Sequence, residues 1–535
     1  MEKAKFSFIK GNAHIASPIT HSSGSNAIMQ HLPSPVNYRE DINGLRAWAV
    51  IAVLLFHFQL PCLGAGFMGV DIFFVISGFL MTAIIIKGLE RDNFSILKFY
   101  MARARRILPA LLVMIVFLLS LGWFYLPTFD YTVLANQSLS ALFFVSNIYF
   151  GLEGSYFANS PYEKWLLHTW SLAVEAQFYV LFPIFLIIVW KIRPRISTVL
   201  WGLIALFFIS LALNIVVSSW KPTIAFYVLP TRAWELAAGG LAFLIGREFV
   251  SLQRFAEPFF WGGFSLFAIA LIVLDSSYAW PSGWALLPVL GTVLIILAQQ
   301  SQAKLTVNPI AQWLGDRSYS LYLWHWPFVV GLNFAGLQQD WAWLSGAIVL
   351  SFIFAHFSYH LVEVPTRSYL SARSLRKEVV LIGFAVMLFV GFSLFVKTNS
   401  IENRIDPLVD MIAGEVGNYN PKREACQPNI MGLNSPGCVF GESKIGAYLI
   451  GDSHSDMVAT AFGEASKNYG LGIQFFGRMS CPTIEGVEIG LSSRAACTNF
   501  NNWLFEFLEK DSSSLPIVVV NTIWHEANHI PRVSF

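Results

Sequence analysis

Long apolar runs divide most of this chain into segments that are long enough to cross a membrane. A crossing helix needs about 20 residues, because it rises about 1.5 Å per residue and the hydrocarbon layer is roughly 30 Å thick. The pattern therefore predicts an α-helical multi-pass membrane domain with about eleven crossings. The eleven runs cover residues 42–60, 67–86, 107–126, 174–190, 197–217, 224–246, 259–275, 283–299, 318–335, 342–361 and 379–396.

A twelfth apolar run, residues 136–150, is shorter and is interrupted by Asn136, Gln137 and Asn147. The positions of Lys and Arg decide its role, because these residues favour the cytoplasmic side of short loops. If this run does not cross, every basic cluster lies on the side of the N-terminus. We therefore interpret 136–150 as interfacial or re-entrant and place the N-terminus in the cytoplasm. The basic clusters cover residues 87–106, 191–195, 247–254, 304–317 and 367–377.

The two ends of the chain differ from this apolar middle part. Residues 1–38 are polar and contain no apolar core of a signal peptide, which predicts a disordered cytoplasmic tail. After eleven crossings, the residues beyond 397 lie outside the cytoplasm. Residues 397–446 are polar and predict a linker, whereas residues 447–535 alternate between strands and helices and predict an α/β domain. The predicted strands are 447–450, 473–476 and 516–520, and the predicted helices are 455–469 and 498–510.

Composition supports a membrane protein and argues against a soluble or a nucleic-acid-binding protein. Hydrophobic residues make up 55% of the 535 residues and charged residues only 13%, whereas soluble domains carry about 25% charged residues. Aromatic residues reach 15%, which suits lipid-facing helices and aromatic belts at the interfaces. The net charge of +2 gives no indication of nucleic-acid binding.

Four of the five cysteines lie in the polar region beyond residue 400. An even set in such a region predicts disulfides in an oxidising compartment. Three pairings are possible, and we favour the sequence-local one, Cys426 with Cys438 and Cys481 with Cys497. The fifth, Cys62, ends the first apolar run. No two cysteines have the two-residue spacing of a metal site, so we predict no bound metal.

The first apolar run carries two ionisable residues, Arg46 and His57. Eleven helical steps of about 100° bring them to nearly the same face, about 16 Å apart along the axis. Ionisable groups inside a membrane are costly and are functional candidates by default. The alternative is that His57 lies in the outer interface, where loop carbonyls satisfy its nitrogens.

Other polar groups lie in or beside the apolar runs, and structural roles remain open for some of them. Arg232 and Glu235 could form an ordinary ion pair at helical spacing. Arg103, Arg105 and Arg106 could only fix topology, or could hold the phosphates of a donor. The further groups are Asp71, Ser77, Glu175, Tyr319, Tyr322 and His325.

In the predicted outer domain, Ser453 stands between a strand and a helix in the sequence Gly451-Asp452-Ser453-His454. Its hydroxyl would lie at the tip of a sheet beside the positive end of a helix, which suits a nucleophile. The same three residues also form ordinary turns and helix caps, which is the alternative.

Five segments in succession resemble the signature blocks of the acyltransferase family 3 membrane proteins. They read INGLRAWAVIAVLLFHF, GFMGVDIFFVISGFL, FYMARARRILPALL, HTWSLAVEAQFYVLFP and SYSLYLWHWP, within residues 39–370. Residues 371–396 form an additional membrane helix. The C-terminal part, with YLIGDSHSD, resembles the SGNH-hydrolase-like domain fused to this family in O-acetyltransferases of O-antigen or peptidoglycan.

This resemblance implies a membrane O-acyltransferase of the bacterial inner membrane. It has no bound cofactor and uses cytoplasmic acetyl-CoA as donor, and the acyl group passes through the membrane domain to a sugar hydroxyl of a surface glycan. His57, Glu175 and Ser453 match the catalytic positions, with acyl-Ser453 as the intermediate. The residues expected to handle the donor are Arg46, Arg103 and Arg106, and those with further possible roles are Asp71, Arg232, Tyr322 and His325.

The sequence departs from the family pattern at two places. The family often has a Glu-Glu pair in the fourth of the quoted blocks, where this chain has Glu175 followed by Ala176. An SGNH site also uses a histidine in a late Asp-x-x-His motif, which is absent before Phe535, and we expect a C-terminal truncation. His525 and His529 do not match that motif, and Asn521 is a candidate oxyanion-hole donor.

Two other functions remain open. The chain could be a transporter or flippase of lipid-linked glycans with a non-catalytic outer domain, although such proteins favour internal repeats and broken helices in matching halves. It could also be a truncated, regulatory relic in which the membrane domain still binds the donor.

Overall fold

The computed structural model describes residues 39–520 except 61–63, 154–160, 276–277, 279, 400–403, 416–419, 427–436, 479–480, 482, 484–493 and 512. The predicted N-terminal tail, Cys62, Asn521, His525 and His529 lie outside these residues.

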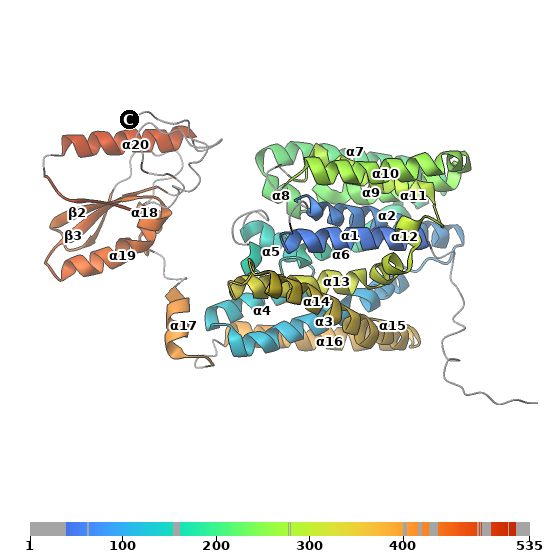
Figure 1. Ribbon diagram of the computed structural model, residues 1–535, viewed down its shortest axis with the longest axis horizontal. Helices are drawn as coiled ribbons and strands as arrows, with labels where there is room; N and C mark the ends of the chain where they lie inside the picture. Colours follow the sequence, from blue (N-terminus) through green and yellow to red (C-terminus); the bar gives the residue numbers. More distant parts are fainter. Residues whose placement is uncertain are drawn as a thin grey trace, which may run out of the picture.

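A bundle of long helices forms the larger part of the molecule, and the smaller α/β part lies beyond one end of it (Figure 1). The helices are α1 (Glu40–His57), α2 (Gly69–Glu90), α3 (Ile96–Tyr125), α4 (Thr128–Leu142), α5 (Ser146–Glu153), α6 (Thr169–Ile192), α7 (Ile196–Trp220), α8 (Pro222–Tyr227), α9 (Leu229–Glu248), α10 (Ala256–Val273), α11 (Leu286–Ala298), α12 (Lys304–Val307), α13 (Pro309–Phe334), α14 (Trp341–Phe357), α15 (Val364–Ser371) and α16 (Leu375–Thr398). Short helical turns are η1 (Gly66–Met68), η2 (Pro161–Glu163), η3 (Val250–Phe255), η4 (Gly283–Ala285) and the π-helical η5 (Ser358–Glu363).

Each of the eleven predicted membrane runs lies mostly within one helix, although the run 224–246 begins in α8 and is interrupted at the extended Val228 before α9. Seven of these helices are long and apolar enough to cross a membrane among the described residues. These seven contain α2, α3, α6, α7, α10, α14 and α16. The other four are α1, α9, α11 and α13. Helix α11 has only 13 residues, and the other three carry charged side chains such as Arg46, Arg232 and Arg317. The buried polar groups of α1, α9 and α13 lower the mean hydropathy of these helices. Hydropathy is the property on which the prediction of eleven crossings rests.

The run 136–150 does not form one helix. Helix α4 ends at Leu142 and α5 begins at Ser146, and Phe144 between them has a positive φ of 52°. A left-handed residue interrupts the helical hydrogen-bond pattern. Neither α4 nor α5 is among the seven helices suited to span a membrane in the described part of the chain.

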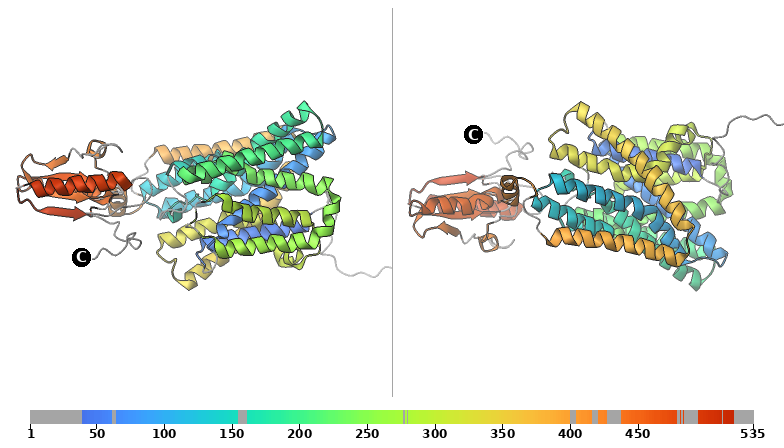
Figure 2. Two further views of the ribbon diagram at one scale, coloured as in Figure 1. Left: turned by 90° about the horizontal axis from the view of Figure 1, so that it is seen from above. Right: turned by 90° about the horizontal axis from the view of Figure 1, so that it is seen from below.

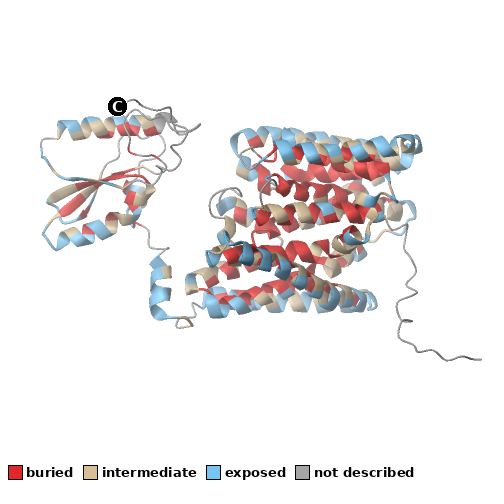
Figure 3. Ribbon diagram, in the orientation of Figure 1, coloured by how far each residue is buried: buried red, intermediate tan, exposed pale blue. Residues whose placement is uncertain are grey.

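The helices of the bundle run side by side in both views of Figure 2, and Figure 3 shows that buried residues concentrate inside the bundle and exposed residues on its outer faces. Exposed large apolar side chains such as Trp201, Phe208 and Phe384 occupy the outward faces, as expected of a surface that faces lipid. Helices α2 and α9 approach closely through Gly78, where a Cβ would lie 1.8 Å from the carbonyl oxygen of Leu236. Small residues allow such close contact in membrane bundles.

The outer part contains a four-stranded sheet between two helices (Figure 1). The strands have the order β1-β3-β2-β4, in which β2 is parallel to β3 and β4, and β1 is antiparallel to β3. Side chains of β2 alternate: Tyr448 and Ile450 share a cluster with Leu504 of α20, whereas Leu449 shares one with Ala459 of α19. This layering confirms the α/β class that was predicted for the C-terminal domain. The elements are α17 (Pro407–Gly414), α18 (Arg423–Cys426), β1 (Cys438–Gly441), β2 (Ile445–Gly451), α19 (Ser453–Lys467), β3 (Gly472–Gly477), α20 (Arg494–Lys510) and β4 (Ile517–Val520).

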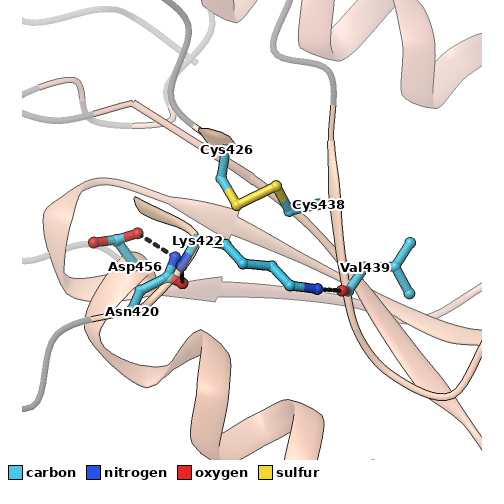
Figure 4. The surroundings of a disulfide bond; sticks show 6 residues. All are labelled: Asn420, Lys422, Cys426, Cys438, Val439 and Asp456. Carbon is cyan, nitrogen blue, oxygen red and sulfur yellow. Dashed lines mark hydrogen bonds between the residues drawn. A yellow bond between two sulfur atoms is a disulfide. The ribbon is translucent and has the colours of Figure 1, made fainter. Parts of the chain in front are cut away.

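Both disulfides of the favoured pairing are present. Cys426 bonds to Cys438, next to the hydrogen bond from Asn420 to Asp456 (Figure 4), and Cys481 bonds to Cys497. The first disulfide and β1 lie within residues 397–446, so the sheet begins earlier than the predicted boundary at 447.

The segment before the outer domain is fastened to the bundle. The Asp410 carboxylate on α17 accepts hydrogen bonds from the backbone N–H of Thr128, at 2.6 Å, and from its hydroxyl, at 2.7 Å. Asp410 thereby satisfies a free N–H at the start of α4. Arg404 donates to the carbonyl oxygens of Trp123, at 2.7 Å, and Leu126, at 3.1 Å, at the end of α3.

Candidate functional site

A cavity of about 80 Å³ lies inside the bundle between α1, α2, α3, α6 and α13. It contains five of the predicted site residues, which come from four different helices. A further wall of apolar side chains includes Val70, Phe73 and Leu172. The polar residues that line it are Arg46, Ser77, Arg103, Arg106, Ser171, Glu175, Tyr179, Ser318, Tyr319 and Tyr322.

Glu175 is the acidic group of this cavity. Its carboxylate accepts short hydrogen bonds from the hydroxyls of Ser77 on α2 and Tyr179 one turn further along α6. The Tyr179 hydroxyl also lies 3.2 Å from that of Ser77. Two donors from different helices thus hold one carboxylate oxygen in place, and Ala176 contributes no second acid.

Three arginines face the same cavity. Arg46 donates to the Ser318 hydroxyl at 2.7 Å, which joins α1 to α13. Arg103 and Arg106 are three residues apart on α3 and therefore share a face. The Nε of Arg103 is buried and has no hydrogen-bond partner within the described structure. A buried guanidinium donor of this kind is available to an anionic ligand.

Arg105 lies between them in sequence but has another role. It donates to both carboxylate oxygens of Glu378 on α16, at 2.9 and 3.0 Å, and it does not line the cavity. Of these three arginines of α3, Arg103 and Arg106 therefore line the cavity, whereas Arg105 joins α3 to α16.

A cluster of histidines lies beyond the cavity, at the C-terminal end of α1. His57 Nδ1 is 2.9 Å from His325 Nε2, and both side chains are buried. The ring of His168, just before α6, lies 5.9 Å from that of His325. Tyr322 connects this cluster with the cavity, because its hydroxyl lies 2.6 Å from Ser171 and donates to the carbonyl of His168 at 2.9 Å.

Asp71, Arg232 and Glu235 form a separate buried group. Arg232 lies 3.2 Å from each of the two carboxylates, and all three side chains are at most 1% exposed. The Arg232 guanidinium also lies over the rings of Phe74 and Trp170. These residues do not line the cavity. The group joins α2 to α9, which fits the ion-pair alternative for Arg232 and Glu235 and adds Asp71 to it.

In the outer domain, Ser453 is the first residue of α19 and follows directly on the central strand β2. The buried Asp452 precedes it as helix cap and accepts from the His454 backbone N–H at 2.9 Å and approaches His454 Nδ1 at 3.1 Å. Gly451 has a φ of 153°, and a Cβ there would lie 2.0 Å from the carbonyl oxygen of Val520 on β4. Glycine is therefore required for the tight strand-to-helix turn that presents Ser453.

Several polar residues of the site were not singled out from the sequence. Tyr179 could have been found from its spacing of four from Glu175, which places both on one face of a helix. His168 and Ser318 gave no signal by spacing, because their partners come from other helices. Their positions depend on which helices are neighbours.

These features define a class: a multi-pass membrane protein with a buried basic cavity and an extramembrane α/β domain that presents a serine. Comparison with known sequences agrees with this class. Residues 39–360 match the acyltransferase domain family, and residues 424–532 match the SGNH domain that is fused to such domains. The chain belongs to this acyltransferase family.

Two of the curated relatives are each similar to about three fifths of this chain. Peptidoglycan O-acetyltransferase OatA of Listeria monocytogenes is 31% identical over 353 residues, which cover 62% of this chain and 56% of OatA. BcsY of Komagataeibacter xylinus, provisionally named as a membrane-bound transacylase, is 34% identical over 338 residues, which cover 62% of this chain and 83% of BcsY. The chain thus spans about half the length of OatA. No solved structure matches the chain.

Proposed function

We propose that this protein is a membrane O-acyltransferase that moves an acyl group, in the simplest case acetyl, from cytoplasmic acyl-CoA to a sugar hydroxyl of a surface polysaccharide. The observation that carries the proposal is the buried cavity in which Arg46, Arg103 and Arg106 meet Glu175. Guanidinium groups bind phosphates in bidentate fashion, and the phosphates of CoA are a suitable partner.

The topology supports transfer from inside to outside. With the N-terminus in the cytoplasm, α1 begins on the donor side and His57, its last residue, lies near the opposite surface. His57 also lines a second small cavity with Gln59 and Tyr162. We assign His57 as the base or acyl relay between donor and acceptor. The two disulfides of the outer domain fit an oxidising, extracytoplasmic compartment.

Ser453 is the proposed acceptor in the outer domain. Its place at the carboxyl end of a central parallel strand and at a helix N-terminus favours a nucleophile. Acyl-Ser453 would then deliver the group to a sugar hydroxyl. The acceptor class follows from the similarity to a peptidoglycan O-acetyltransferase. We propose peptidoglycan or lipopolysaccharide O-antigen as the glycan.

The test is the O-acetyl content of the surface polysaccharide in cells that produce the protein. We expect acetylation with the wild type, and none with His57→Ala or Ser453→Ala. Arg105→Gln serves as a control on the same helix as the donor-binding arginines, because it lies outside the cavity. Normal acetylation by His57→Ala would contradict the proposal. Loss of glycan export in His57→Ala would instead support a transporter of lipid-linked glycans.

A further inference from the structure

The histidine pair at the end of α1 has a defined hydrogen-bond direction. His325 Nδ1 lies 3.1 Å from the carbonyl oxygen of Leu321, one turn earlier in α13. A carbonyl oxygen can only accept, so His325 Nδ1 carries a proton. Burial disfavours charge, and in the uncharged ring His325 Nε2 is then an acceptor.

This direction determines the tautomer of His57. His57 Nδ1 is 2.9 Å from His325 Nε2, and since His325 Nε2 accepts, His57 Nδ1 must carry the proton. The other nitrogen of the uncharged His57 ring, Nε2, then carries a lone pair. We propose that His325 is a positioning residue that fixes this tautomer and so makes Nε2 the reacting atom of His57. The inference rests on the proposed acyl transfer.

The surroundings of His57 hold the ring in one orientation. The ring planes of His57 and His325 are nearly parallel, at 15°. Trp326 packs against His57 at a centroid distance of 4.8 Å, and the Trp326 indole N–H donates to the carbonyl of Lys164 at 2.8 Å. Consecutive residues of α13 thus supply the hydrogen-bond acceptor and a fixed aromatic wall. A ring constrained in this way retains one nitrogen toward its partner and the other toward its reactant.

A hydroxyl group could reach His57 through the second small cavity, which has a volume of about 20 Å³ and is also lined by Gln59, Tyr162 and Asn333. A space of roughly 10–15 Å³ already holds a water. In the transfer step, the hydroxyl oxygen bonds to the acyl carbonyl carbon while His57 Nε2 takes its proton. The carbon–sulfur bond then breaks, and the CoA thiolate recovers the proton from Nε2. The hydrogen bond from His57 Nδ1 to His325 persists throughout and supports the transient positive charge.

Two substitutions of His325 separate positioning from packing. In His325→Gln the amide oxygen replaces Nε2 as acceptor, whereas His325→Leu fills similar space without any acceptor. We expect His325→Leu to lower kcat for acyl transfer by about 10²- to 10⁴-fold, the range for losing base catalysis or the correct tautomer. The KM for acetyl-CoA should not change, because the donor-binding arginines are untouched. His325→Gln should remain within about tenfold of wild type. Equal loss in both variants, or full activity of His325→Leu, would overturn the assignment.

Solid-state ¹⁵N NMR of the histidine-labelled full chain in nanodiscs gives a readout that does not depend on activity. The His57 signals are identified by their absence in His57→Gln. We expect protonated Nδ1 and unprotonated Nε2 in wild type and His325→Gln, and loss of that preference in His325→Leu. A protonated Nε2 in the wild type would overturn the inference. Absence of acyl transfer by the wild type, with the expected NMR pattern, would overturn the proposed function and leave the tautomer assignment intact.

Discussion

Arg103 and Arg105 offer a matched test of the proposed donor-binding cavity. They have the same chemistry and lie two residues apart on α3, yet Arg103 lines the cavity and Arg105 pairs with Glu378. We consider Arg103→Gln and Arg105→Gln in the full-length protein in nanodiscs. Each substitution removes one positive charge from the same turn, so long-range electrostatic effects are alike. The difference between the variants then reports on the local partner.

The structure gives different magnitudes for the two changes. Arg103 has a buried Nε without a hydrogen-bond partner in the described residues, so at this atom its substitution breaks no internal hydrogen bond. A charge-assisted hydrogen bond to a donor phosphate is worth about 1.5–3 kcal/mol, which corresponds to a roughly 10- to 150-fold rise in Kd. Arg105→Gln instead leaves Glu378, only 3% exposed, without its cation. We expect a loss of stability of about 1–3 kcal/mol and an unchanged Kd.

Calorimetric titration with acetyl-CoA measures the Kd, and thermal unfolding in the same nanodiscs measures stability. The expected result is a crossed pattern, with weaker binding only in Arg103→Gln and a lower Tm only in Arg105→Gln. If Arg103→Gln binds acetyl-CoA as tightly as the wild type does, the cavity is not the donor site. If both variants lose binding equally, the effect is one of overall charge.

Three further outcomes are expected. Cys426→Ser opens the loop closed by the bond to Cys438, across a sequence separation of 12, and should lower the free energy of unfolding of the outer domain by about 3 kcal/mol in a denaturant titration. Gly451→Ala places a Cβ 2.0 Å from a carbonyl oxygen of β4; it should abolish acetylation of the glycan without changing the Kd for acetyl-CoA, and normal acetylation would refute the assigned turn. Although burial raises the pKa of Asp410, the hydrogen bonds from the start of α4 outweigh it and hold that pKa below its ordinary value. Its contribution should therefore be present above about pH 4 and be lost as the pH falls through the lower folded value. The protection factors of amides in α17, which compare exchange with the intrinsic rate at the same pH, should therefore fall at low pH in the wild type and already at pH 7 in Asp410→Asn.

The positions of the helices could be predicted because an apolar run of fixed length has few alternatives. Each predicted membrane run lies mostly within one helix. The strand β1 was missed, although β4 is equally short and also lies at a sheet edge. Strand β4 consists of four consecutive β-branched residues, Ile517–Val520, whereas β1, Cys438–Gly441, has only Val439 and Phe440 between a cysteine and a glycine. Two apolar residues are too few to be recognised as a strand.

The sequence predicts which types of residue form the site, but it does not predict which of these residues lie together. Helical spacing shows that Arg103 and Arg106 share a face, but it cannot show which helices are neighbours. For that reason the sequence predicts Asp71 and Arg232 as candidate site residues together with Glu175, whereas in the structure they form a separate ion group. Likewise, His168 joins His325 only through the packing of the segment before α6 against α13.

The hydrogen bonds between α17 and α4 limit how far the outer domain can move away from the membrane domain. Asp410 is bonded to the start of α4, and Asn420 already belongs to the outer domain, because it donates to Asp456 at 2.7 Å. Only five peptide units separate Glu415, directly after α17, from Asn420, and they can span at most about 18 Å. Short flexible linkers give effective concentrations in the millimolar range. Ser453 is therefore held near the membrane domain at an effective concentration of about that size. For the proposed transfer of an acyl group to Ser453, such a restraint would make brief encounters sufficient, and no large permanent interface between the two domains would be required.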